Sequence, residues 1–283
     1  MMLKICLDIL PDEEHRAWLE AKALEVSTGA KASKFYLAFS SAPRKTCKAP
    51  LTLRLAQLEQ LRSLQPAFNP ATWTIDELCR VTLMTCLPTE TNHEVLEKLF
   101  GTADMRESVA LYKGLSFLEN AEAFRLRAID GLRTNITPVF DAIALDNPYA
   151  EKYFAEQPWN QMVLKAMFME RPLYRIYGLD RRRNKTLALI LRDYAHERWS
   201  AHRSVSTELW RNAVGFIDAP LLEDLQRVLN EGTGRERFAA ALAIRESGLA
   251  EADTILAKAG IAPADLPEWD ELGRAEEADK TLG

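Results

Sequence analysis

The chain has few of the residues that build the most recognisable functional sites. It contains 12 glycines in 283 residues, and it has no GxxxxGK phosphate loop, no GxGxxG after a strand and no GxSxG nucleophile elbow. Its 4 cysteines form no CxxC pair, and none has a histidine at zinc-ligand spacing. We therefore expect buried thiols that pack as small apolar residues, and no resident metal or other cofactor.

An excess of basic residues and a long apolar run are also missing. The 36 Lys and Arg residues are outnumbered by 41 Asp and Glu residues, for a net charge of -5, which disfavours a nucleic-acid partner. No segment reaches the ~18 apolar residues that a membrane span requires, since even the run from Met162 to Met169 contains Lys165. The first ten residues show no signal-peptide pattern, so a cytoplasmic protein is expected.

Helical periodicity is the strongest pattern that is present. Pro11 followed by three acids is typical of a helix start, and Thr74 with Glu77 forms a capping-box pattern. Pro43, Pro66 and Pro88 are expected to end helices. The predicted helices cover residues 11–29, 34–42, 51–64, 74–88, 91–100, 104–118, 121–133, 137–147, 159–170, 187–202, a segment capped by Ser206, 221–229, 235–247 and 251–259.

Strand patterns are absent, and helix breakers occur every ~12 to 20 residues. Helix pairs therefore repeat at roughly 30 to 40 residues, which favours stacked helical hairpins in an all-α, α-α superhelix of the HEAT or armadillo type. The alanine-rich segment 235–244 is similar to the second helix of a HEAT repeat. No sequence motif recurs between pairs, so an irregular helical bundle is the alternative. Residues 1–264 are predicted to form one helical domain, and residues 265–283 an acidic C-terminal tail, either a solvated helix or frayed.

Polar groups accumulate between Asn135 and Trp210, inside amphipathic helices and at their ends. Their density predicts a strip of side chains that could bind a small molecule or a partner. The alternatives are internal networks that fix helix packing and, for Arg181–Arg183, a solvated loop. The predicted ligand-binding residues are Arg133, Asn135, Asn147, Asn160, Lys165, Asp180, Arg181 and Arg198.

One helix in this region also contains candidates for acid–base chemistry. Asp193, His196 and Glu197 lie within about 100° of one another around the helix axis, so either acid could orient the imidazole. There is no HExxH motif, because the next histidine, His202, points about 240° away, and no third metal ligand can be identified. A buried packing network is the alternative to a general acid–base pair.

Several segments between Phe35 and Arg211 form a distinctive set. They are Phe35-Tyr-Leu-Ala-Phe-Ser, Ala42-Pro-Arg, Lys48-Ala-Pro-Leu, Gly131-Leu-Arg-Thr-Asn, Phe140-Asp-Ala-Ile-Ala-Leu-Asp-Asn-Pro-Tyr, Trp159-Asn-Gln-Met-Val-Leu-Lys-Ala, Gly178-Leu-Asp-Arg-Arg with Asn184, Asp193-Tyr-Ala-His-Glu-Arg-Trp and Glu208-Leu-Trp-Arg. In these segments the chain resembles the EboA-domain proteins, the small helical members of bacterial and algal ebo gene clusters. The resemblance is loose over residues 66–120.

The resemblance implies a helper protein of a cluster that also encodes a prenyltransferase and other metabolic enzymes. It supplies no catalytic residues. We therefore expect a non-enzymatic binding or scaffold protein of secondary or isoprenoid-linked metabolism. Its partners would be a small metabolite or proteins of the same cluster. The alternative is an enzyme, such as a metal-assisted hydrolase or transferase, that uses His196 with Asp193 or Glu197.

Overall fold

The computed structural model describes residues 1–29 and 31–282, and this part of the chain is all-helical. It divides into two compact units, Met1–Phe154 and Ala155–Gly283, which are described separately below. No β-strand occurs in the described residues, and the isolated β-bridge there pairs Pro50 with Thr74. None of the helices in these residues is both long and apolar enough to span a membrane.

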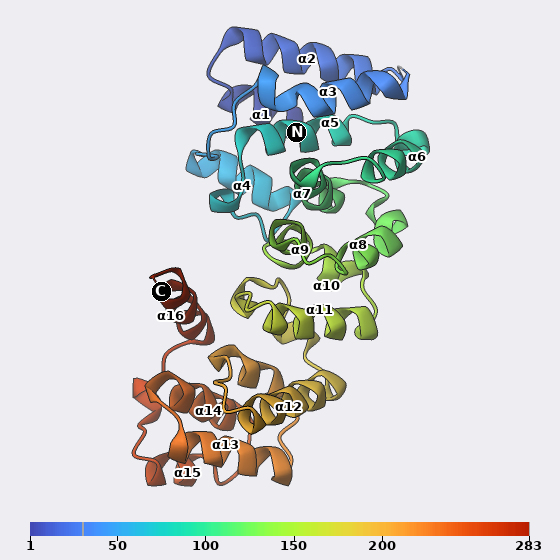
Figure 1. Cartoon of the computed structure of the whole chain (residues 1–283). Coiled ribbons are helices and arrows are strands. Elements are labelled where there is room, and N and C mark those ends of the chain that lie inside the picture. The colour runs from blue at the N-terminus through green and yellow to red at the C-terminus, as the bar shows by residue number, and fades with distance from the viewer. Residues whose placement is uncertain (30, 283) are drawn as a thin grey trace. The chain divides into compact units, whose positions relative to one another are not determined.

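The first unit contains α-helices joined by short turns and 3-10 helices, the latter labelled η. In Figure 1, α2 and α3 lie side by side at one end of this unit, next to α5. Its elements are α1 (Met2–Ile9), α2 (Glu13–Ser27), α3 (Ala32–Lys45), α4 (Leu55–Leu64), η1 (Pro70–Thr72), α5 (Ile75–Thr85), α6 (Thr89–Phe100), α7 (Met105–Gly114), η2 (Leu115–Phe117), η3 (Ala121–Phe124), α8 (Arg125–Gly131), α9 (Thr137–Ala144) and α10 (Tyr149–Tyr153).

Successive helices of the first unit pack in order along the chain. Helix α3 packs on α5, α5 on α7, and α7 on α9. The core of α5 contains Leu78, Val81 and Leu83, all with 0% exposure. Cys6 and Cys79 are also fully buried, with their sulfur atoms 3.4 Å apart between α1 and α5. This order resembles stacked hairpins, but a regular repeat or superhelix stays a prediction.

Several helix ends differ from the sequence prediction, which also missed α1, and two of these differences have a clear physical cause. Helix α3 does not end before Pro43 but continues to Lys45. Proline has no N–H, which leaves the carbonyl of Phe39, four residues earlier, without its helical donor. The buried guanidinium of Arg80 replaces that donor, because its Nε lies 3.1 Å from the Phe39 oxygen. A long-range hydrogen bond therefore lets the helix pass through a proline.

The start of α4 was also predicted too early. Residues 51–54 are extended because the backbone N–H of Leu51 donates to the oxygen of Trp73 at 2.9 Å. Two capping predictions are confirmed. Thr74 and Glu77 form the capping box of α5, and Asn184 accepts a hydrogen bond from the N–H of Leu187 at 2.8 Å. Caps depend on residues three positions apart, so the sequence is sufficient to identify them.

The second unit is arranged around a 3-10 helix. Segment η6 packs against α12, α14 and α16, and all seven of its residues are buried. Figure 1 shows α13 and α14 side by side in this unit. Its elements are α11 (Glu156–Phe168), η4 (Leu173–Arg175), η5 (Asp180–Arg182), α12 (Lys185–Ser200), η6 (Thr207–Ala213), α13 (Ala219–Glu231), α14 (Gly234–Glu246), α15 (Ala252–Lys258), η7 (Pro263–Asp265) and α16 (Trp269–Leu282).

Small residues allow close packing around η6. The alanines of α14, Ala239–Ala241 and Ala243, have 0% exposure, and α14 packs on both α13 and η6. The described part of the acidic segment 265–283 is largely the helix α16, which buries Trp269 and Leu272. That segment is therefore a packed element of the second unit. The extent of the single domain predicted for residues 1–264 stays a prediction.

Candidate functional site

A cavity of about 660 Å³ lies within the second unit. Its wall combines the ends of α11 and α12, the loop before η6, the first turn of α14 and the last turns of α16. Met167, Tyr194, Val205 and Phe238 supply the apolar part of this lining. Hydroxyl groups of Ser204, Ser206, Thr207 and Thr233 and several charged side chains supply the polar part.

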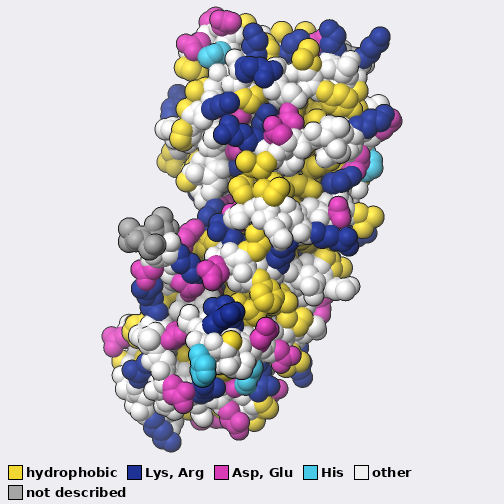
Figure 2. All heavy atoms as spheres, in the orientation of Figure 1, with side chains coloured by type: hydrophobic (Ala, Val, Ile, Leu, Met, Phe, Trp, Pro, Cys, Tyr) yellow, Lys and Arg dark blue, Asp and Glu magenta, His cyan; other side chains and the backbone are white. Residues whose placement is uncertain are grey.

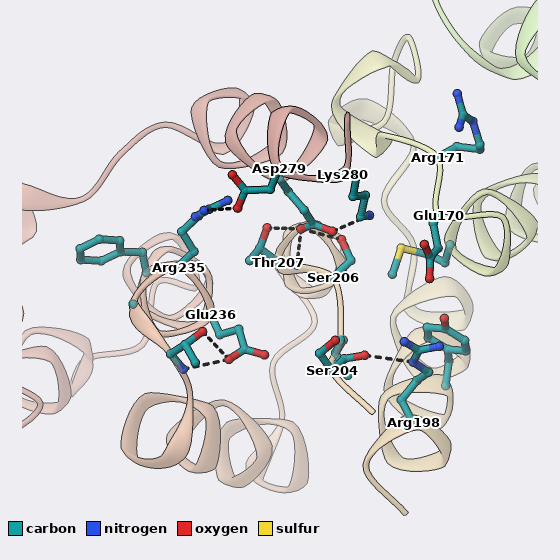
Figure 3. A pocket seen from close by; sticks show the side chains of 17 residues that line it. Glu170, Arg171, Arg198, Ser204, Ser206, Thr207, Arg235, Glu236, Asp279 and Lys280 are labelled. Atoms are coloured by element: carbon teal, nitrogen blue, oxygen red, sulfur yellow. Dashed lines mark hydrogen bonds and ion pairs between the residues drawn. The ribbon is translucent and has the colours of Figure 1, made fainter. Parts of the chain in front are cut away.

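Several of the charged groups around this cavity are held by hydrogen bonds or ion pairs (Figure 3). Arg235 on α14 pairs with Asp279 on α16, and Figure 3 shows these two side chains pointing toward one another. Arg198 donates from Nε to the carbonyl of Ser204 at 3.0 Å, and its guanidinium lies 6.0 Å from the centre of the Tyr194 ring. These contacts hold the side chains at the rim of the cavity in place. They also leave the rim without a large excess of positive or negative charge.

The most strongly bonded of these groups is the carboxylate of Glu276 on α16. It accepts hydrogen bonds from the hydroxyl of Thr207 at 2.6 Å, from the N–H of Thr207 at 2.9 Å and from the hydroxyl of Ser206 at 3.1 Å. Lys280 donates to its other oxygen at 2.9 Å. In Figure 3 the dashed lines from Thr207, Ser206 and Lys280 converge on it. Burial would raise the pKa of Glu276, but these donors outweigh it and hold the pKa below its ordinary value.

A smaller cavity of about 200 Å³ shares part of the same wall. It has four lining residues in common with the larger one, namely Glu170, Arg171, Glu276 and Lys280. Glu208 and Gly273 also line it. Glu208 is 2% exposed, and burial raises its pKa to about 8, with a further contribution from the negative charge of Glu276. The two cavities are therefore neighbours, and the smaller one contains a buried acid that is largely protonated at neutral pH.

Of the predicted ligand-binding residues, three belong to the first unit. Arg133 is exposed and lies 3.6 Å from Asp130, and Asn135 is also exposed. Asn147 is buried and has a structural role, since its side chain donates to the oxygen of Ala142 at 2.8 Å and accepts from the N–H of Tyr149 at 3.0 Å.

The other five belong to the second unit. Asn160 forms a reciprocal amide pair with Asn184, and Arg181 lies 4.7 Å above the ring of Tyr177. Lys165 is half-buried, and burial lowers its pKa. Asp180 forms a bidentate ion pair with Arg211, both bonds at 2.6 Å. Arg198 alone among the predicted residues lines the large cavity as described here. One continuous strip formed by all eight stays a prediction.

The candidate histidine has a carboxylate partner, but not one of those predicted. His196 Nε2 lies 2.9 Å from Asp224 on α13, and Arg192 donates to the same oxygen at 2.5 Å. Asp193 and Glu197 are exposed. Asp224 is buried, so these contacts link α12 to α13, as in the packing-network alternative. The described residues contain no group of three or more potential metal ligands, and His196 lines none of the cavities described here.

Several residues of the site were missed from the sequence. Glu208 was recognised only as part of a shared segment, and Glu276 and Lys280 fall in the segment predicted as a tail. The hydrogen bonds that hold these acids join residues far apart in the sequence. Thr207 and Glu276 are 69 positions apart, and Leu173 and Glu208 are 35 positions apart. The local signal that could have pointed to the site is an acid directly before two large apolar residues, Glu208 before Leu209 and Trp210.

Comparison with known proteins supports the resemblance found in the sequence. A family model described as "Metabolite traffic protein EboA" matches residues 1–214. Searches of curated proteins and of solved structures gave no match. The matched region includes α11, α12 and η6, whereas the cavity residues on α14 and α16 lie beyond it.

Proposed function

Because the chain belongs to the EboA family, we propose that it is a non-enzymatic binding protein for a small metabolite. The observation that carries the proposal is the cavity of about 660 Å³ in the second unit. Its volume falls within the range of about 300–1,000 Å³ typical of small-molecule sites. The family description fits such a role in handling metabolites.

The lining indicates what kind of molecule would fit. Met167, Tyr194 and Phe238 can contact an apolar or aromatic body, and the hydroxyl groups around Ser206 and Thr207 can orient polar substituents. The charges at the rim, such as Arg235 with Asp279, already neutralise one another. Figure 2 likewise shows basic and acidic side chains mixed over the visible face of the second unit. A largely apolar metabolite with few charges matches this lining better than a polyanion.

We further propose that the protein passes this metabolite to proteins of an ebo-type cluster of secondary or isoprenoid-linked metabolism, in the cytoplasm. The family description supports the handling of metabolites, which is the general part of this proposal. The enzyme alternative with His196 stays a prediction. The pairing of His196 with Asp224 favours a role in packing.

A variant that fills the cavity provides the test. Gly234 lines the cavity, and a Cβ atom added there would meet no other atom within 4 Å, so Gly234→Trp adds a bulky indole at the cavity wall with no clash at Cβ. Gly101→Trp is the matched control, because Gly101 is exposed in the first unit and its added Cβ would make ordinary contacts of 3.5 and 3.8 Å.

Each purified full-length protein would be incubated with a small-molecule extract of cells that carry an ebo-type cluster. Retained compounds would be identified by ultrafiltration and mass spectrometry. We expect the wild type and Gly101→Trp to enrich the same compound and Gly234→Trp to lose it. Equal enrichment by all three proteins would exclude this cavity as the site, and no enrichment by the wild type would contradict metabolite binding.

A further inference from the structure

The buried acid of the smaller cavity has one oxygen that the protein leaves without a hydrogen bond. Glu208 Oε2 accepts from the backbone N–H of Leu173 at 2.7 Å, and the backbone N–H of Tyr174 also points to this carboxyl group and lowers its pKa, without completing a hydrogen bond to Oε1. Oε1 is buried and has no hydrogen-bond partner. Buried polar atoms are nearly always bonded, and an unpaired one destabilises the fold. An atom of this kind in the wall of a cavity is therefore a candidate contact for a ligand.

The backbone around Glu208 is shaped to accommodate this acid. A Cβ atom on Gly273 would lie 2.8 Å from Glu208 Oε1 and 2.6 Å from the Tyr174 ring. Any larger residue at position 273 would therefore press on the carboxyl group. The absence of a side chain at this position of α16 lets the helix pass close to η6 while the acid keeps its place in the wall.

The charges of this cavity favour a positively charged group. Four carboxyl groups line it, from Glu170, Glu208, Glu276 and Glu277, against two cationic groups, from Arg171 and Lys280. Because Glu208 is largely protonated before a ligand binds, three carboxylates oppose these two cations, and the lining has a small excess of negative charge. A carboxylate or phosphate ligand would be repelled by this set, whereas an ammonium group would be attracted and can donate up to three hydrogen bonds. The cavity volume of about 200 Å³ has room for an ammonium group and a few carbon atoms.

From the unpaired Glu208 Oε1 and the acidic wall around it, we propose that the smaller cavity binds the ammonium group of an amine-bearing metabolite. Glu208 Oε1 accepts the hydrogen bond from the amine. This inference rests on the proposed function, because the two cavities share part of their wall and the rest of the same molecule would occupy the larger cavity. It adds the chemical class of the ligand, a primary amine with an apolar body.

Amine binding should be accompanied by release of a proton. At pH 7 a carboxyl group of pKa about 8 is about nine-tenths protonated, and an ammonium partner favours its ionised form. The proton on Glu208 therefore leaves when the amine binds. The charged and titratable groups that surround it from the packed elements are Glu170, Arg171, Tyr174, Arg211, Glu276, Glu277 and Lys280.

Three probes with the same body but different polar groups test the inference, namely 2-phenylethylamine, 2-phenylethanol and 3-phenylpropionate. Each would be titrated into the full-length protein by calorimetry at pH 7, in two buffers with different heats of ionisation. We expect the amine to bind at least tenfold more tightly than the alcohol and the carboxylate. The buffer dependence should show release of about 0.9 proton per amine bound.

Glu208→Gln keeps the shape of the side chain and removes its charge and its titration. We expect this variant to bind the amine no better than the alcohol, to release no proton and to bind the alcohol within about twofold of the wild type. Glu231→Gln, an exposed position on α13, is the matched control and should behave as the wild type. The number of protons that the wild type releases per amine bound is measured without this variant. The inference therefore stays testable even if Glu208→Gln does not fold.

The outcomes separate this inference from the proposed function. If the alcohol binds as tightly as the amine and no proton is released, the amine inference is overturned while binding in the larger cavity stands. If none of the probes binds, the amine inference is also overturned, and the extract experiment with Gly234→Trp decides the proposed function by itself.

Discussion

Replacing Gly273 by alanine should destabilise α16, against the usual effect of this substitution. In an exposed helix interior, Gly→Ala stabilises by about 1 kcal/mol. At position 273, however, the new methyl group would lie 2.6 Å from the Tyr174 ring and 2.8 Å from Glu208 Oε1. Such overpacking typically costs about 1–3 kcal/mol, and both neighbours are fixed, Glu208 by its bond to Leu173 and Tyr174 by a 2.5 Å bond to Glu277. After the gain of about 1 kcal/mol in helix propensity is subtracted, we expect a net loss of up to about 2 kcal/mol.

Hydrogen exchange measured by mass spectrometry would detect this change in α16 and η4 of the full-length protein. A loss of up to about 2 kcal/mol speeds the exchange of these segments by up to about thirtyfold. Gly234→Ala is the matched control, because its added Cβ meets nothing within 4 Å, and it should leave exchange unchanged or slow it slightly. Slower exchange of α16 in Gly273→Ala would refute the close approach between α16 and Glu208.

Three further predictions concern buried groups. The folded state keeps a proton on Glu208 that the unfolded chain loses above pH 4.5, so the unfolding free energy should fall by about 1 kcal/mol per pH unit between pH 5 and 8. Glu208→Gln should abolish that contribution in denaturant titrations. Arg211→Met should cost about 2 kcal/mol in the same assay, because Asp180 and Asp270 lose a buried partner but are themselves 44% exposed; a change below about 0.5 kcal/mol would contradict this. Cys6 and Cys79 should react with a thiol reagent only after denaturant is added, whereas Cys47 and Cys86 should react in the native protein; rapid native reaction of all four would contradict the buried pair.

The all-helical class and many helix ends could be predicted because they depend on neighbours in sequence. The capping box of Thr74 and the cap of Asn184 each need a residue three positions away, and both are present. The continuation of α3 through Pro43 could not be predicted, since it depends on Arg80, 41 residues away from the carbonyl it contacts. The non-helical residues 51–54 before α4 were missed for the same reason, since Leu51 is held by a hydrogen bond to the distant Trp73.

The polar strip predicted between Asn135 and Trp210 and the lining of the large cavity overlap only in part. Arg198 does line the large cavity, and the segment from Glu208 to Arg211 was recognised as distinctive. Several other predicted polar residues are held by specific partners, such as Asn147, Asn160 and Asp180. Periodicity places a polar side chain on a helix face, but it cannot tell whether a partner such as Asp224 or Glu276 from a distant helix lies opposite.

The most direct test of the central claim, that a metabolite occupies the cavity of the second unit, is hydrogen exchange of the full-length protein with and without the compound enriched from the extract. The account predicts slower exchange on binding at three segments of the cavity wall, residues 204–207, 233–238 and 276–280. Protection confined to residues 1–154, or no change in these three segments at saturating ligand, would contradict it.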